Sequence, residues 1–341
     1  MGNPVAARPG RGHLTPVARG RRGMLAPVAR RRRAWRASTI LLVALAGAGA
    51  AGCGLGPGPT PGGVRLTVTD GFGSRLIYSG ARPRISGQDT VMRLLQRNGS
   101  VTTRYGGGFV QSIDGLAGGQ VGGRPVDWFY YVNGIEAPVG AASTTLRAGD
   151  RVWWDRHDWG AAMETPAVVG SFPEPFTDAS GEHRTPVMVE CERPGSAPCQ
   201  LVGARLAAVG VPARRSSLSA GPVPSGLRVL VGRWASVRTD RTAATLERGP
   251  AATGVFARPD PTGRTLTMLD QTGRAASVLE AGSGLVAATR TGDADPVWLV
   301  TGTDWAGVAA AARVFDAGDL RDHFALAVSA GRRIALPQVR S

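Results

Sequence analysis

The sequence predicts an α+β protein, with a small α+β domain over residues 64–160 followed by a separate, compact α/β domain over residues 161–341. Three observations indicate this division. The first domain holds one helical pattern among several short stretches of alternating polar and apolar residues. The second domain alternates apolar, strand-like runs with helical patterns. The residues before them are rich in Arg, Ala, Gly and Pro and show neither pattern, so we expect the fold to begin at residue 64.

Residues 1–52 have the three-part layout of a secretory signal peptide. An arginine cluster at residues 30–33 is followed from Ile40 by an apolar run of about a dozen residues, and then by small residues. This run is too short to remain as a transmembrane helix. Met24 also precedes a signal of ordinary length, so the natural start is either Met1 or Met24. We expect the mature chain on the extracytoplasmic side of the membrane.

The signal ends in Ala50-Ala51-Gly52-Cys53, which resembles a bacterial lipobox. This resemblance implies that Cys53 becomes an acylated N-terminus, and two or more acyl chains would hold the protein durably at the cell membrane. The alternative is an ordinary cleaved signal in which Cys53 has no role. Residues 53–63 consist of Cys53 and a Pro/Gly-rich stretch, which we expect to be a linker that does not fold by itself.

The charge of the chain is carried by arginine, because all 40 basic residues are arginine and none is lysine. The absence of lysine excludes enzymes that use a lysine Schiff base, a P-loop lysine or the protein-kinase lysine. Ten arginines and no acidic residue lie before Cys53, so the rest of the chain has 30 basic and 25 acidic residues, a net charge of +5. We therefore expect no nucleic-acid partner. Such a composition is typical of GC-rich, actinobacteria-like genomes.

The sequence of the first domain predicts one helix that lies across a mixed sheet. Residues 87–99 combine a cap at Asp89/Thr90 with apolar side chains at helical spacing. Asn133-Gly134, directly after an aromatic run, is a strong hairpin signal. We expect the strands at residues 64–70, 75–78, 109–113, 128–132 and 151–155.

Four segments of this domain together resemble a known module. They are Val91-Met-Arg-Leu-Leu, Gly108-Phe-Val-Gln-Ser-Ile-Asp-Gly115, Trp128-Phe-Tyr-Tyr-Val-Asn-Gly134 and Leu146-Arg-Ala-Gly-Asp-Arg-Val152. Their succession is similar to the β-grasp-like domain at the C-terminus of transcobalamin and intrinsic factor, which also occurs in bacterial surface proteins. The resemblance covers about 95 residues, and the aromatic strand ending in Tyr-Val-Asn-Gly is its most specific element.

The resemblance implies a β-grasp-like fold and a corrinoid as the candidate small-molecule ligand. The positions that it points to as ligand-binding are Trp128, Tyr130, Tyr131 and Asn133. In the vitamin carriers a separate helical barrel forms the other side of the corrinoid pocket, and this chain has no helical-barrel repeats. The resemblance is therefore a stronger guide to the fold of this chain than to its ligand.

The aromatic strand at residues 128–132 allows two interpretations. Alternation along a strand points Trp128 and Tyr130 to one face and Phe129 and Tyr131 to the other. One face must then be core, and the second is either an open platform for a flat ligand, a sugar or another protein, or a further packing surface.

The sequence of the second domain predicts a β-α-β unit, followed by short strands and a final strand–helix pair. We expect strands at residues 186–191, 227–232, 254–257, 265–269, 284–288, 297–304 and 333–336, and helices at 200–209, 305–315 and 319–330. Cys191 and Cys199 are expected to form a disulfide, because disulfides persist in exported proteins. A metal site is the alternative, and it would need further ligands from the few histidines. We expect no bound metal and no cofactor, and we recognise no family here.

Catalytic patterns are weak throughout. Asp155, His157 and Asp158 are interpreted as a solvated, charged strand edge, and Asp304 as the cap of the helix that follows it. The chain has no G-x-S-x-G elbow and no H-E-x-x-H motif. We therefore expect no enzyme; a hydrolase would have to use His157, His183 or His323.

The leading hypothesis is an extracytoplasmic lipoprotein that binds a ligand, with a corrinoid as the candidate, and delivers it to a transporter for uptake. Its anchor, its linker and its aromatic domain all favour this interpretation. The alternative hypothesis is a structural or adaptor lipoprotein that binds an envelope protein or polymer and needs no small molecule.

Overall fold

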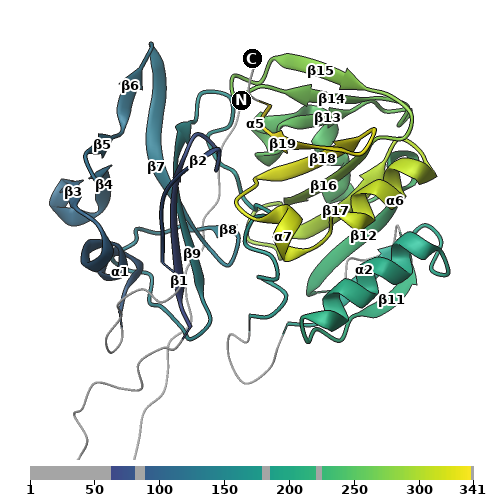
Figure 1. Ribbon diagram of the computed structural model, residues 1–341, viewed down its shortest axis with the longest axis horizontal. Coiled ribbons are helices and arrows are strands. Elements are labelled where there is room, and N and C mark those ends of the chain that lie inside the picture. Colours follow the sequence, from purple (N-terminus) through teal and green to yellow (C-terminus); the bar gives the residue numbers. More distant parts are fainter. Residues whose placement is uncertain (1–62, 81–88, 179–184, 220–224, 339–341) are drawn as a thin grey trace, which may run out of the picture. The chain divides into compact units, whose positions relative to one another are not determined.

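The computed structural model describes residues 63–80, 89–178, 185–219 and 225–338 (Figure 1). The expected signal peptide, Cys53 and nearly all of the expected linker lie outside the described residues. No helix within the described ranges has both the length and the apolar character needed to cross a bilayer.

The alternating segments of the first region, residues 63–160, form a mixed sheet. Its strands are β1 (Arg65–Asp70), β2 (Arg75–Gly80), β6 (Gly119–Val121), β7 (Arg124–Val132), β8 (Ile135–Glu136) and β9 (Arg151–Asp158). The order is β2-β1-β9-β7-β6, with β8 beside β7. The central pair β1/β9 is parallel, whereas β1/β2 and β7/β9 are antiparallel. The predicted hairpin is confirmed, because Asn133 and Gly134 have the φ values of 56° and 78° that such a turn needs.

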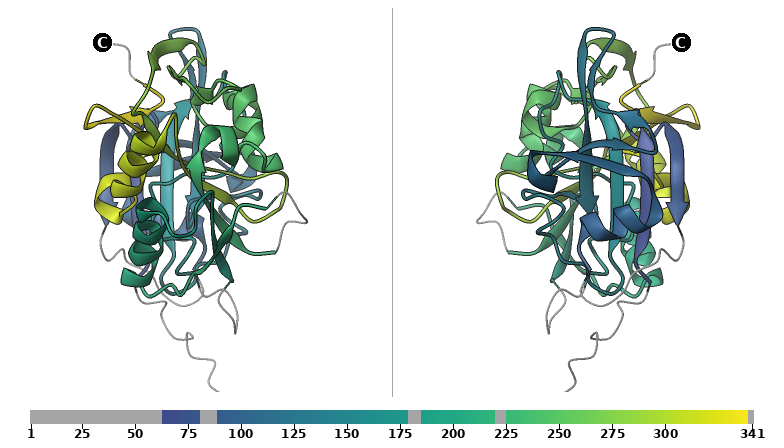
Figure 2. Two further views of the ribbon diagram at one scale, coloured as in Figure 1. Left: turned by 90° about the vertical axis from the view of Figure 1, so that its right-hand side faces the viewer. Right: turned by 90° about the vertical axis from the view of Figure 1, so that its left-hand side faces the viewer.

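One helix, α1 (Val91–Asn98), covers one face of this sheet (Figure 2, right). The Thr90 hydroxyl accepts a hydrogen bond from the Arg93 amide and caps its first turn. The buried side of α1 packs in one apolar cluster with side chains of β1, β7 and β9. A small antiparallel sheet follows it, made of β3 (Val101–Arg104), β4 (Phe109–Ile113) and β5 (Leu116–Ala117), with the 3-10 turn η1 (Tyr105–Gly107). The expected arrangement of one helix on a mixed sheet is confirmed.

The second region, residues 161–338, is built on a seven-stranded sheet. Its strands are β10 (Val187–Cys191), β11 (Arg214–Ser217), β12 (Leu227–Arg233), β16 (Gly284–Thr289), β17 (Val297–Gly302), β18 (Ala325–Ser329) and β19 (Arg332–Leu336). The order is β11-β10-β12-β17-β16-β18-β19, with parallel pairing from β11 to β17 and antiparallel pairing beyond. The protein is therefore an α+β protein with several sheets.

Each face of the large sheet is covered, because successive residues of its strands point to opposite sides. Val286 packs in the cluster that contains the helices α2 (Ala197–Ala208), α6 (Trp305–Arg313) and α7 (Ala317–Leu320), whereas Leu285 and Ala287 pack in the cluster on the opposite face. That opposite face carries the short elements α3 (Trp234–Val237), α4 (Arg241–Ala244), η2 (Thr245–Arg248) and α5 (Pro250–Thr253), and the small sheet of β13 (Ala257–Pro259), β14 (Leu266–Leu269) and β15 (Ala275–Leu279).

The predicted disulfide between Cys191 and Cys199 is present and ties the end of β10 to the first turn of α2. The predicted cap of α6 is present as well, because the Asp304 carboxylate accepts a hydrogen bond of 2.8 Å from the Gly307 amide.

The helix expected at residues 319–330 is wrong. Only α7 is helical there, and the apolar run that follows it is the strand β18. Ala325 and Ala327 pack on one face of the large sheet and Leu326 packs on the other, so all three are buried. A short run that is apolar on every side does not distinguish a buried strand from a buried helix. The strand expected at residues 254–257 is also displaced, because Gly254 ends α5 with a φ of 69° and β13 begins only at Ala257.

Residues of both expected domains share one hydrophobic core. Phe72 and Trp153 of the first region lie in the same apolar cluster as Phe256, Leu299 and Phe324 of the second. The Phe72 ring is 4.9 Å from the Phe256 ring and 5.1 Å from the Phe324 ring, centroid to centroid. All described residues accordingly belong to a single compact unit.

Candidate functional site

Both faces of the aromatic strand β7 are covered by protein. Trp128 and Tyr130 are 5% and 8% exposed and pack in the cluster beneath α1. The Trp128 indole donates a hydrogen bond of 3.0 Å to the Leu116 carbonyl, and the Tyr130 hydroxyl lies 2.8 Å from the Thr144 hydroxyl. The polar atoms of these two predicted ligand-binding residues are thus occupied by neighbours within the chain.

Tyr131 and Asn133, the other two predicted residues, lie elsewhere. The fully buried Tyr131 ring lies 5.6 Å from the Phe324 ring in the shared core. Burial raises the pKa of its hydroxyl, whereas the neighbouring Thr165 side chain lowers it. The Asn133 amide donates to the carboxylates of Asp150 and Asp178, at 3.0 and 3.1 Å. The structure therefore does not gather the four residues at one surface, and their role in ligand binding stays a prediction.

The face of β1 and β9 that turns away from α1 carries most of the polar side chains. The parallel register places Arg65 opposite Arg151, Thr67 opposite Trp153, and Thr69 opposite Asp155. Side chains two residues apart share a face, so these six residues form three rows on one surface. A buried polar cluster lies at the Asp155 end of the surface, and a cavity lies at the Arg65 end.

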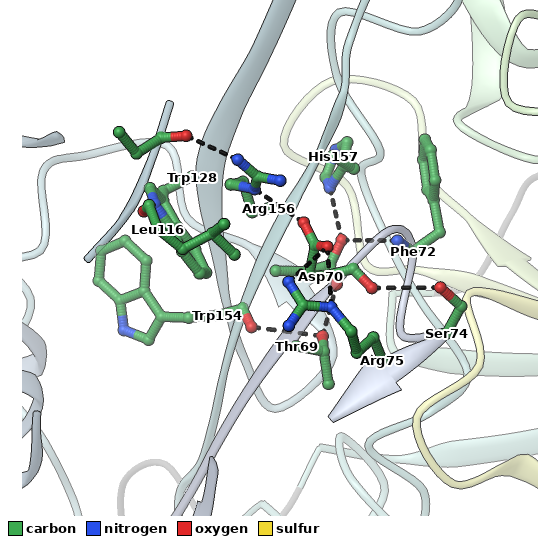
Figure 3. Close-up of polar contacts among 12 residues, drawn as sticks. Thr69, Asp70, Phe72, Ser74, Arg75, Leu116, Trp128, Trp154, Arg156 and His157 are labelled. Carbon is green, nitrogen blue, oxygen red and sulfur yellow. Dashed lines mark hydrogen bonds and ion pairs between the residues drawn. The ribbon is translucent and has the colours of Figure 1, made fainter. Parts of the chain in front are cut away.

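The buried cluster is organised by Asp155, and Figure 3 shows its partners Thr69, Phe72 and His157. The Asp155 carboxylate accepts hydrogen bonds from the amides of Phe72 and Gly73, at 3.0 and 2.9 Å. It also contacts the Thr69 hydroxyl and lies 2.8 Å from Nδ1 of His157. These bonds hold the β1–β2 turn against β9, so the carboxylate is buried with its partners in place.

The interpretation of Asp155, His157 and Asp158 as a solvated edge is wrong. All three are buried, and the His157 ring is stacked between Phe72 and Phe129, with both centroid distances at 4.5 Å. The β1–β2 turn folds over this end of β9 and supplies hydrogen-bond donors that a strand pattern alone does not reveal. No group of three residues suited to hold a metal ion occurs among the described residues.

The cavity at the other end has a volume of about 220 Å³. One side is formed by β1, β2 and β9, including Arg65 and Arg151, and the other by Gly170, the buried Ser171, Arg321 and Asp322. Both regions of the chain thus contribute to its wall.

Glycines allow the two sides to approach. A Cβ atom on Gly170 would lie 2.7 Å from the Trp153 ring and 2.8 Å from the His323 amide nitrogen. A Cβ atom on Gly73, which has a φ of 78°, would lie 1.9 Å from the carbonyl oxygen of Asp322. A side chain at either position would push the walls of the cavity apart.

Positive charge dominates the cavity. Arg65 and Arg151 are cross-strand neighbours, and like charges in that position repel. Burial lowers the pKa of the Arg151 guanidinium, and the nearby Arg65 and Arg321 lower it further, whereas Glu174 raises it. Within the described part of the chain, none of the three arginines has a carboxylate within ion-pair distance.

Asp322 is the acidic side chain in the cavity wall, and burial raises the pKa of its carboxyl group. Three guanidinium groups and one carboxyl group leave an excess of positive charge. Such a site attracts an anion, because a guanidinium donates charge-assisted hydrogen bonds to carboxylate and phosphate oxygens.

A second polar cavity, of about 450 Å³, lacks this excess. Its acidic residues Glu136, Glu164 and Asp293 face the arginines Arg248 and Arg290. The nearly balanced charge gives no preference for an anion, so the arginine cavity is the better candidate site.

The sequence contained only part of the signal for this cavity. The strands that carry Arg65 and Arg151 were expected, but their parallel pairing, which brings the two arginines together, is a matter of topology. Arg321 follows α7, in a segment that the pattern assigned to a longer helix.

Comparison with known proteins identifies one segment. Residues 88–158 match the model of a family described as a domain of unknown function, DUF4430. No curated protein matches the chain, and no solved structure does. The matched segment extends from the start of α1 to the end of β9, so it includes Arg151 of the cavity but neither Arg65 nor Arg321.

Proposed function

We propose that this protein is a lipoprotein on the extracytoplasmic face of the cell membrane that binds a small-molecule ligand for uptake, with the arginine cavity as its binding site. The observation that carries the proposal is the cavity itself, an open, polar space with wall residues from both regions of the chain. The signal-like leader and Cys53 support the location. The disulfide supports an oxidising compartment.

A corrinoid remains the candidate ligand that the resemblance of the first region supports. The cavity of about 220 Å³ is smaller than the roughly 300–1,000 Å³ of most small-molecule sites. A corrinoid would therefore extend over the surrounding surface, with only one of its polar groups in the cavity.

Anchoring is tested by replacing the cysteine. Cells that express the full-length protein are labelled with radioactive palmitate, and the membrane and soluble fractions are compared. We expect label on the wild-type protein and none on Cys53→Ala, which should leave the membrane fraction. An unlabelled wild-type protein would refute the lipoprotein proposal.

Corrinoid binding is tested on the full-length protein in detergent. It is titrated with cobalamin and with cobinamide, by calorimetry and by the corrinoid absorbance spectrum. Saturable heat together with a spectral shift would identify a corrinoid carrier. The absence of both signals would exclude corrinoids as ligands, and titration with small anions would then decide whether the cavity binds a ligand.

An adaptor role is the second candidate, and one observation favours it. Tyr105 is 86% exposed, at the tip between β3 and β4, and its φ is 53°, which is uncommon for a residue with a side chain. An exposed aromatic ring is a typical anchor for a protein partner. A photo-crosslinking amino acid at position 105 should then capture one specific envelope protein in intact cells, whereas the same group at exposed position 278 should not.

A further inference from the structure

We infer that the arginine cavity recognises the phosphoryl group of a phosphate monoester, held by Arg65, Arg151 and Arg321. This inference rests on the proposed function, because it names the ligand class of the same site.

The first argument is the unbalanced charge. Arg65 and Arg151 lie side by side on parallel strands, an arrangement that destabilises a sheet when no anion separates the charges. Arg151 is partly buried, and its guanidinium donates a hydrogen bond of 3.1 Å to the Phe172 carbonyl. A bound dianion would relieve the repulsion and compensate the desolvated charge.

The second argument is the number of guanidinium groups at the cavity. Two guanidinium groups come from the neighbouring strands β1 and β9, and the third comes from the turn after α7 on the other side of the cavity. A planar carboxylate presents two oxygens in one plane, which suits a single guanidinium fork. A tetrahedral phosphoryl group presents three terminal oxygens in different directions and can accept from all three arginines.

The third argument is the supply of neutral donors. The hydroxyl groups of Thr67, Ser79 and Ser171 belong to residues of the same wall. Ser171 is buried and lines the cavity beside Gly170. Hydroxyl groups beside arginines are a common complement to phosphate oxygens.

The fourth argument is size. A volume of about 220 Å³ accommodates a phosphoryl group with a small organic substituent and excludes a large apolar ligand. Arg65 and Arg321 line the cavity and are exposed to solvent, so the rest of the ester can extend into solvent on their side.

The experiment is a calorimetric titration of the full-length protein in detergent at low ionic strength. The probes are phenyl phosphate, inorganic phosphate and benzoate, which replaces the phosphoryl group of phenyl phosphate by a carboxylate. We expect saturable binding of phenyl phosphate, weaker binding of inorganic phosphate if the phenyl group contributes, and little binding of benzoate. Added salt should weaken the binding, because the contacts are ionic.

The variant for this test is Arg65→Gln/Arg321→Gln, because both side chains are exposed and their replacement leaves the core intact. The matched control is Arg75→Gln/Arg333→Gln, two arginines whose side chains are both 58% exposed and that pair with carboxylates outside the cavity. Both variants lose the same net charge. We expect the first to weaken phenyl phosphate binding about a hundredfold, about tenfold for each guanidinium, and the control to leave it unchanged.

Three outcomes would overturn the inference: no binding of either phosphate, equal loss in the two variants, or benzoate binding as tightly as phenyl phosphate. Native mass spectrometry of the protein isolated from its own membranes distinguishes a failure of this inference from a failure of the proposed function. A retained small molecule without a phosphoryl group, lost in Arg65→Gln/Arg321→Gln, would sustain ligand binding in the cavity and refute only its phosphate specificity.

Discussion

The contact between the β1–β2 turn and the backbone of Asp322 gives the sharpest test of how the cavity is built. A methyl group on Gly73 would place its carbon 1.9 Å from the Asp322 carbonyl oxygen, whereas ordinary contacts begin at 3.4 Å. In Gly73→Ala the turn or the segment at Asp322 must therefore move by about 1.5 Å. The Trp153 ring, 3.1 Å from the added carbon, blocks one direction of movement.

Two costs add up in this variant. A left-handed φ destabilises a residue with a side chain by about 1 kcal/mol. The forced movement of packed backbone adds about 2 kcal/mol, as in other overpacked sites. Gly106 is the matched control, because its φ of 69° is similar and a Cβ atom there would meet nothing within 4 Å. Gly106→Ala should therefore cost only about 1 kcal/mol.

Denaturant unfolding of the two variants and the wild type measures the difference. We expect Gly73→Ala to lose about 3 kcal/mol and to exceed Gly106→Ala by about 2 kcal/mol. The displaced wall should also weaken ligand binding in the cavity of Gly73→Ala alone. If the two variants lose equal stability, the turn does not pack on Asp322 in solution, and the described geometry of the cavity is refuted.

Three other changes test other parts of the fold. Arg228→Met should destabilise the protein by about 3 kcal/mol, because it strands two buried carboxylates, and a loss below about 1 kcal/mol in denaturant unfolding would contradict this. The double replacement Cys191→Ala/Cys199→Ala should cost about 2.5 kcal/mol through the short loop that the bond closes, and an unchanged midpoint would count against a structural role. Burial lowers the pKa of His323, so the unfolded chain binds its proton first and stability falls as the pH drops below about 6.5, the ordinary pKa of histidine. His323→Gln should lose less stability over that range, and an equal loss would exclude this histidine as the cause.

Local patterns were sufficient for most elements. Helix α1 was predictable because its cap at Thr90 and its apolar spacing are both local, and the turn at Asn133-Gly134 because its backbone needs those residues. Strand β18 was not predictable, because a run that is buried on both faces shows no alternation of polar and apolar residues. The conformation of residues 325–329 is decided by the neighbouring strands β16 and β19, whose positions are set by tertiary packing.

The candidate site was less predictable than the fold. The resemblance pointed to the aromatic residues Trp128 and Tyr131 as ligand-binding, yet both pack in hydrophobic clusters of the structure. The cavity depends on Arg65 and Arg321, which are distant in sequence and meet only because the turn after β1 packs on the segment after α7. A single sequence contains no signal for such a meeting.

The parallel pairing of β1 with β9 has a consequence for how the DUF4430 segment behaves when it is cut out. Residues 88–158 contain β9 but not β1, so an excised segment would present the backbone of β9 as an unpaired edge. Its Trp153 face would also lose the apolar cover that residues such as Phe324 provide. An exposed, apolar edge of this kind promotes association between chains. In this protein the boundary of the matched segment is therefore not a boundary for folding, and a fragment that begins at residue 88 should aggregate unless a strand is supplied to it.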